Sequence, residues 1–328
     1  MKALIFFLID IPLSITAGIP VYFVSLLIRF VSVVKIFSLF RSDDSIPVSV
    51  IYLSSGGSVS ESAKKFGGLD FLVNYEGSAV NNFFHKVILY WFPAGNNLHL
   101  LAGKNFEVYE CKHWKYLPLC SSLLCLVKIL HRIYFAGDNV GVIRAYDPFI
   151  SGMIGFFVSK FAGPRNIPYC VSIHADYDKR WALNRALSGA TIFGSHKVAN
   201  LVARFVLSKA KEVLPIRESL ADYAIRHGAS RDRIRIIPHG LDLSYFEKTS
   251  LVENFKTSYG IPEDKKLVVS VGRLSRENYV YDIIEVARLV IWTRKDVVFV
   301  LAGGGDEIEG LKTKAKLYGL GEDNLRFV

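Results

Sequence analysis

The chain has 328 residues, of which 51% are hydrophobic and 13% aromatic, and it contains no repeat or low-complexity tract. This composition excludes intrinsically disordered and fibrous proteins and predicts about two globular domains. The net charge is +10, and the excess of lysine and arginine lies before residue 241. That asymmetry predicts an anionic partner, such as a phospholipid surface, a lipid-linked phosphate or nucleic acid.

The first forty residues carry only four charged side chains, and an uncharged run extends from Ile11 to Ile28. Residues 3–9 are apolar, a turn-rich segment with Gly18 follows, and residues 21–31 and 34–40 are apolar again. This order is typical of strand, glycine-containing loop, helix and strand, the first unit of a doubly wound sheet. A helix that spans or dips into a membrane is the alternative, because the uncharged run is close to the lower limit for a span.

Between residues 48 and 240, strand-length apolar runs alternate with longer amphipathic segments, as in a parallel sheet with helices on both faces. We predict strands at 48–53, 140–146, 167–173 and 235–237, and helices at 118–135, 151–161, 198–213 and 219–227. Residues 61–110 alternate short apolar runs with glycine and asparagine and do not clearly predict helix or strand. Two interpretations of the helix at 118–135 stay open: a buried helix packed on the sheet, or an interfacial membrane anchor with a basic rim.

The pattern relaxes around residues 243–253, and a second alternation follows. Its predicted strands are 266–271, 297–301 and 324–328, and its predicted helices are 281–292 and 307–318. The four cysteines, at positions 111, 120, 125 and 170, show no Cys-x-x-Cys spacing and no clustering with histidine. That spacing argues against a zinc site or a disulfide framework and fits a reducing cytoplasm.

Four short segments, taken in chain order, contain motifs that bear on the family of the protein. They are residues 167–174, which end in His174; residues 236–246, with Pro-His-Gly; residues 269–275, with Gly272-Arg273; and residues 298–305, which end in three glycines. This ordered set resembles the family 4 glycosyltransferases. The resemblance implies an α/β, GT-B fold with two Rossmann-like, doubly wound parallel-sheet domains, the second incomplete. Residues 1–245 would form the N-terminal acceptor-side domain and residues 246–328 a partial C-terminal nucleotide-sugar-binding domain.

The donor of this family is a nucleotide sugar, whose diphosphate needs fixed cations and backbone N–H groups. Arg273 follows a predicted strand, where its guanidinium can hold the diphosphate and stabilise the leaving group. Three consecutive glycines let the backbone approach a phosphate or a ribose, although a plain strand-to-helix turn explains them equally well; they are Gly303, Gly304 and Gly305. Gly18 lies in the loop where the family's acceptor domain meets the donor phosphate, with a turn glycine as the alternative.

His174 ends a predicted strand and is the candidate for contact with the sugar or the acceptor, with a structural histidine as the alternative. Asp176 belongs to a polar cluster just after it, which favours a cleft, and Asp147 ends the preceding strand and is expected to face the same cleft. The resemblance therefore implies catalytic roles for His174 and Arg273. It implies substrate-binding roles for Gly18, Asp147, Asp176, Arg273, Arg276, Asn278, Gly303, Gly304 and Gly305, and no metal site.

The sequence departs from the family in two places. The lysine that usually follows the arginine by five residues is Asn278 here, so one cation is missing unless Arg276 reaches the phosphate. The chain also ends at Val328, before the family's segment with two glutamates, one for the donor sugar and one for the ribose. We therefore expect a truncated form, and the activity of this chain by itself stays open.

The resemblance implies a retaining hexosyltransferase that moves a sugar from a nucleotide sugar to a hydroxyl acceptor, without a cofactor or a metal on the diphosphate. The expected acceptor is lipid-linked or a cell-surface polysaccharide precursor, at the inner face of the membrane in the cytoplasm. Nucleic acid is not an expected partner, because the basic residues are scattered and no stacking motif is evident. Two alternatives stay open: a non-catalytic or degenerate relative, and a membrane-anchored binding protein that uses residues 1–40 or 112–135.

Overall fold

The computed structural model describes residues 49–55, 84, 86–94, 98–102, 105–112, 118–135, 138–163, 167–184, 195–239 and 255–328. The chain divides into two compact units, one of residues 1–176 and 186–239 and the other of residues 177–185 and 240–328. The elements predicted within the first forty residues, Gly18 among them, lie outside the described ranges. The boundary predicted after residue 245 also lies outside them and stays a prediction.

The first unit is built on a seven-stranded sheet with the order β3-β4-β2-β1-β5-β6-β7. Its strands are β1 Ser49–Ser55, β2 Lys86–Ala94, β3 Leu98–Ala102, β4 Phe106–Lys112, β5 Val140–Ala145, β6 Tyr169–Ile173 and β7 Glu212–Pro215. Every neighbouring pair is parallel except β3 and β4. The strand order reverses between β1 and β5, and in such sheets ligands bind at the carboxyl ends of the strands beside that reversal.

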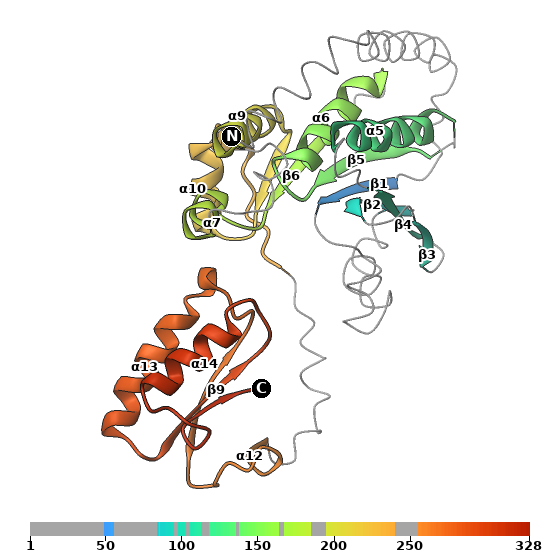
Figure 1. Cartoon of the computed structure of the whole chain (residues 1–328). Coiled ribbons are helices and arrows are strands. Elements are labelled where there is room, and N and C mark those ends of the chain that lie inside the picture. Colours follow the sequence, from blue (N-terminus) through green and yellow to red (C-terminus); the bar gives the residue numbers. More distant parts are fainter. Residues whose placement is uncertain are drawn as a thin grey trace, which may run out of the picture. The chain divides into compact units, whose positions relative to one another are not determined.

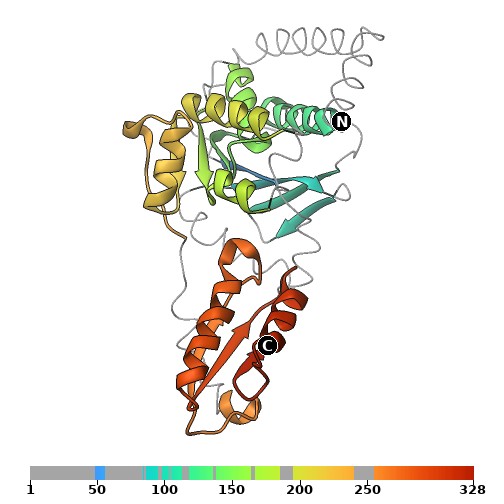
Figure 2. The same ribbon diagram turned by 60° about the vertical axis from the view of Figure 1, so that its left-hand side comes forward.

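Three helices cover one face of this sheet: α5 Pro118–Phe135, α6 Ile150–Phe161 and α9 His196–Lys209. Helix α6 packs between the other two, and Figures 1 and 2 show the three side by side. Gly152 permits this closeness, because a Cβ there would lie 2.5 Å from Val206 of α9. On α5, Ile129, Leu130 and Ile133 are buried. The prediction that α5 packs on the sheet is therefore confirmed for one side of the helix.

Two sequence predictions in the first unit are wrong. The helix predicted at 198–213 ends at Lys209, and residues 212–215 form β7 before helix α10, Glu218–Arg226, begins. The chain turns into a strand because it pairs with β6, a tertiary contact that overrides local helix preference. The strand predicted at 235–237 is an extended segment that hydrogen-bonds to β7, with one bridge from Val213 to Ile234.

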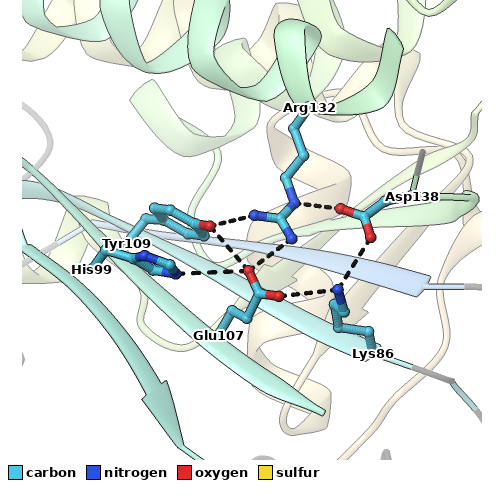
Figure 3. A network of polar contacts seen from close by, with 6 residues as sticks. All are labelled: Lys86, His99, Glu107, Tyr109, Arg132 and Asp138. Atoms are coloured by element: carbon cyan, nitrogen blue, oxygen red, sulfur yellow. Dashed lines mark hydrogen bonds and ion pairs between the residues drawn. The ribbon is translucent and has the colours of Figure 1, made fainter. Parts of the chain in front are cut away.

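A network of charged side chains fastens α5 to the sheet at the amino ends of the strands (Figure 3). Lys86 Nζ lies 3.0 Å from Glu107 Oε1 and 3.3 Å from Asp138 Oδ1. Arg132 of α5 lies with Nη2 2.7 Å from Glu107 Oε2, and it also binds Asp138 and donates to the Tyr109 hydroxyl. Burial alone would raise the pKa of Glu107, but the hydrogen bond from Lys86 and the charge of Arg132 lower it below its usual value.

The second unit contains a parallel sheet with the order β10-β9-β8. Its elements are α7 Tyr177–Asn184, α12 Phe255–Ser258, β8 Lys266–Val271, the 3-10 turn η4 Arg276–Asn278, α13 Val280–Thr293, β9 Val297–Ala302, α14 Ile308–Leu317 and β10 Leu325–Phe327. All five elements predicted after residue 260 are confirmed within two residues. Ile284, Phe299 and Leu311 form the centre of its core.

The α/β class and the two parallel sheets agree with the sequence prediction. Strands β2, β3 and β4 come from a region for which we had no prediction. Within the described ranges, no helix has both the length and the hydropathy that crossing a bilayer requires.

Candidate functional site

The carboxyl edge of the first sheet carries a stack of aromatic rings. Tyr146 follows β5 and His174 follows the adjacent strand β6, and their rings stack with centroids 5.4 Å apart. The His239 ring also stacks with that of His174, with centroids 5.2 Å apart and His239 Nε2 3.4 Å from His174 Nδ1. Because parallel strands bring their carboxyl ends to one edge, residues far apart in sequence meet here.

Arg144 of β5 holds Tyr146 in this stack. Its Nε donates to Ser172 Oγ on the neighbouring strand β6 at 2.9 Å. The guanidinium carbon then lies 5.3 Å from the centre of the Tyr146 ring and 5.5 Å from that of Tyr52. Both distances fit a cation–π contact. Tyr146 thus contacts both a cation and an imidazole.

His174 is a neutral imidazole near pH 7. Burial, followed by the charges of His239 and Arg144, lowers the pKa of His174 to about 4. Its Nε2 is buried and has no hydrogen-bond partner among the residues that the structure describes. A neutral imidazole with one unused nitrogen can accept a hydrogen bond from, or donate one to, a hydroxyl group. This arrangement fits the predicted contact with a sugar or an acceptor.

Acidification is expected to destabilise the first unit through His174. An unfolded histidine has a pKa of about 6.5, so between that value and about 4 the unfolded chain binds a proton that the folded chain does not. The free energy of unfolding should fall over this window as the pH drops, by at most about 1.4 kcal/mol per pH unit. Urea unfolding between about pH 7 and about pH 4.5 measures the slope. The His174→Gln variant should lose the contribution of His174 to this slope. An identical slope in the variant would contradict the lowered pKa of His174.

The two aspartates predicted for the same cleft have partners of their own. Asp147 is buried, and its Oδ1 accepts the backbone N–H of Phe149 at 2.7 Å, which shapes the turn into α6. Asp176 forms an ion pair with Arg226 at 3.0 Å. Both follow strands of the parallel sheet near His174, as predicted, and their roles toward a substrate stay predictions.

The carboxyl edge of the second sheet carries two arginines. Arg273 follows β8, is 66% exposed in its side chain, and lies with Nη1 3.3 Å from Glu277 Oε1. Arg276 is 61% exposed and lies with Nε 2.8 Å from Glu307 Oε1. Glu277 also accepts from Arg180 of α7 at 2.8 Å. The two guanidinium groups are thus exposed to solvent, whereas Glu277 and Glu307 are 17% and 21% exposed in their side chains.

Asn278 supports the backbone at this edge. Its Nδ2 donates to the carbonyl oxygen of Arg273 at 2.7 Å, which closes the turn between β8 and α13. The amide thus fixes the loop that carries Arg273. Whether Asn278 also touches a ligand stays a prediction.

The three glycines lie in a loop that packs directly on the loop after β8. A Cβ at Gly303 would lie 2.1 Å from the carbonyl oxygen of Gly272, and a Cβ at Gly305 would lie 2.1 Å from that of Leu274. Nothing lies within 4 Å of a Cβ at Gly304. The close packing of the two loops therefore requires glycine at positions 303 and 305. The sequence analysis considered a ligand contact and a plain turn for these glycines, but not this packing. Gly304 is the one left open toward a ligand.

The sequence analysis missed several residues of these two edges. Tyr146 and Arg144 belong to a predicted strand, and His239 lies in the quoted Pro-His-Gly segment, but only the fold brings them to His174. The carboxylates Glu277 and Glu307 were not considered as partners of the arginines. In the described part of the chain, no three histidine, cysteine, aspartate or glutamate side chains gather as metal ligands would. The expected independence from a metal stays a prediction.

Two family models match the chain. The model described as "Glycosyl transferase 4-like domain" matches residues 112–240, and that described as "Glycosyl transferases group 1" matches residues 252–328. The first covers the strands that lead to Tyr146 and His174, and the second covers the arginine edge. Together the two matches cover more than half of the chain, in the order that the sequence motifs predicted.

Known proteins agree with these matches. The alpha-monoglucosyldiacylglycerol synthase of Streptococcus pneumoniae is 24% identical over 185 residues, which are 54% of this chain and 40% of that protein. The chain therefore spans less than half the length of this curated relative. The structure of sucrose-phosphate synthase from Thermosynechococcus elongatus superposes with a TM-score of 0.60 at 18% identity, over 86% of this chain and 70% of the other. HepE of Anabaena, solved with UDP and glucose, has a TM-score of 0.58 at 14% identity, over 86% and 69%. The chain belongs to the family 4 glycosyltransferases with the GT-B fold.

Proposed function

We propose that this protein is a retaining hexosyltransferase that moves a sugar from a nucleotide sugar to a hydroxyl acceptor. Family membership supports sugar transfer as the reaction class. The observation that carries the donor half of the proposal is the pair of exposed arginines, Arg273 and Arg276, at the carboxyl edge of β8. Two cations at a strand end suit a diphosphate, and the open position at Gly304 lets the backbone approach one.

In the proposed reaction, the bond between the anomeric carbon and the diphosphate breaks, and the acceptor oxygen bonds to that carbon with retention of configuration. Negative charge grows on the diphosphate as it leaves, and the guanidinium of Arg273 stabilises that charge. The acceptor hydroxyl gives up its proton to the departing diphosphate oxygen as the new bond forms. We expect His174 to orient a sugar or acceptor hydroxyl through a hydrogen bond to its Nε2, which has no other partner among the described residues. We expect the arginines, in place of a metal, to neutralise the diphosphate.

The proposed acceptor is a lipid-linked molecule or a cell-surface polysaccharide precursor at the inner face of the cytoplasmic membrane. The basic charge of the first 240 residues supports an acceptor at an anionic surface. The name of the Streptococcus pneumoniae relative, a synthase of a glucosylated diacylglycerol, supports the same class of acceptor. We propose no role for nucleic acid.

Replacing Arg273 by alanine is expected to weaken nucleotide-sugar binding about tenfold to a hundredfold, because a charge-assisted hydrogen bond contributes about 1.5–3 kcal/mol. Isothermal titration calorimetry with UDP-glucose, then with other UDP- and GDP-sugars, measures the affinity. The matched control is Arg288→Ala on α13, because Arg288 is also exposed and paired with a glutamate, Glu285. Equal donor affinity of Arg273→Ala and the unmodified chain would exclude the proposed role.

The alternative of a non-catalytic relative makes a different prediction for the same protein. It predicts donor binding that depends on Arg273 but no release of nucleotide when an acceptor is added. A coupled assay for free UDP, with diacylglycerol in vesicles as the first acceptor, distinguishes the two. Binding of the nucleotide sugar without release of UDP would show that the protein is a binding protein and would contradict the proposed transferase activity.

A further inference from the structure

The three helices that cover the first sheet contain no acidic residue. Helices α5, α6 and α9 have 18, 12 and 14 residues, and none of these is aspartate or glutamate. Five cations are exposed on them: Lys128, Lys160, Lys197, Arg204 and Lys209. None of the five pairs with a carboxylate in the part of the chain that the structure describes. On α13 and α14 of the second unit, by contrast, Arg288, Lys312 and Lys314 pair with glutamates.

The same surface exposes apolar side chains between its cations. On α9, Leu201 is 65% exposed and lies between Lys197 and Arg204, one helical turn from each. On α5, Leu124 is 41% exposed and Phe135 is 52% exposed, and Lys128 lies on the same side of the helix. Leaving such side chains in water is unfavourable, so the arrangement points to a surface that accepts both apolar groups and positive charge.

We propose that this basic helical face, defined by Leu124, Lys128 and Phe135 of α5 and Lys197, Leu201 and Arg204 of α9, docks on an anionic lipid surface. Lysine and arginine would lie among the lipid head groups while leucine and phenylalanine enter the boundary with the acyl chains. The helices contribute their outer sides only, because their inner sides pack on the sheet (Figures 1 and 2). This inference deepens the proposed function and rests on it, because the proposed lipid-linked acceptor is what would bring the protein to a membrane.

The composition of the face favours lipid over a protein partner. Lysine is depleted at the centre of protein interfaces, because its strongly hydrated ammonium group is costly to bury. Here Lys128 on α5 and Lys197 on α9 each lie one helical turn from an exposed leucine, Leu124 and Leu201. At a lipid surface the ammonium group stays hydrated among phosphates while the alkyl stem covers apolar area.

Co-sedimentation of the full chain with vesicles tests the inference. We expect binding to phosphatidylcholine vesicles that contain about one third phosphatidylglycerol, little binding to pure phosphatidylcholine, and weaker binding when salt rises from about 0.1 M to about 0.5 M. The double variant Lys197→Glu/Arg204→Glu should reduce the bound fraction at least about tenfold. Leu201→Gln should reduce it with no change in charge. The matched control Lys312→Glu/Lys316→Glu on α14 should bind as the unmodified chain does.

Three results would overturn the inference: no binding to anionic vesicles, equal binding by the α9 double variant, or equal binding to neutral and anionic vesicles. Self-association that the α9 variants abolish, in the absence of vesicle binding, would overturn it in favour of a protein partner. Calorimetry with UDP-glucose on the same variants separates the two proposals. Donor binding without vesicle binding refutes only the lipid-docking face, and vesicle binding without donor binding refutes only the proposed donor site.

Discussion

Replacing Arg132 by methionine is expected to lower the free energy of unfolding of the first unit by about 3–5 kcal/mol. The arginine side chain is 13% exposed and contacts two carboxylates that are equally shielded, Glu107 and Asp138. Methionine keeps most of the volume but removes the charge, so two carboxylates would share the single cation of Lys86. An uncompensated buried charge costs far more than an exposed one.

Urea unfolding of the variant and of a matched control measures this effect. The control is Arg235→Met in the same unit, because Arg235 also pairs with a carboxylate, Glu212, but these two side chains are 56% and 34% exposed, and its loss should cost less than about 1 kcal/mol. Adding Glu107→Gln to Arg132→Met should recover part of the loss, since it removes one of the unpaired charges. A loss below about 1 kcal/mol for Arg132→Met would show that the network does not hold α5 to the sheet.

Alanine in place of Gly305 is expected to destabilise the second unit by about 2–4 kcal/mol. The added Cβ would lie 2.1 Å from the carbonyl oxygen of Leu274, a backbone atom that cannot move aside alone. The two loops would have to separate, which breaks the hydrogen bond from the Leu274 N–H to the carbonyl of Gly304. Alanine at Gly303 should act in the same way, with added backbone strain because its φ is +142°.

The matched control lies between them. A Cβ at Gly304 would have no atom within 4 Å, so Gly304→Ala should change the free energy of unfolding of the second unit by less than about 0.5 kcal/mol. If the backbone at Gly304 approaches a nucleotide sugar, the same variant should still weaken binding of UDP-glucose in calorimetry. Unchanged stability with unchanged binding would assign these glycines to the packing of the two loops alone, and equal destabilisation at all three positions would contradict the described contacts.

Local patterns in the sequence were sufficient for most helices and strands. Helix α5 was predicted with the same bounds, because its buried positions recur at helical spacing. Strand β8 was also predicted with the same bounds, because it is a short apolar run of β-branched residues. The ordered motifs around His174, Arg273 and the three glycines were enough to indicate the family, which the two family models confirm.

The sequence by itself therefore determined the features that depend on residues a few positions apart. These are the periodicity of each segment, the class of the fold and the candidate strand ends. Only the tertiary structure decided which segments pair, as for β7, whose four residues become a strand through contact with β6. It also decided the partners of the candidate residues, since His239 lies 65 positions from His174 and Glu307 lies 31 positions from Arg276. The physical reason is that strand pairing, burial and charge pairing act between groups that are close in space, and no local pattern encodes which distant groups those will be.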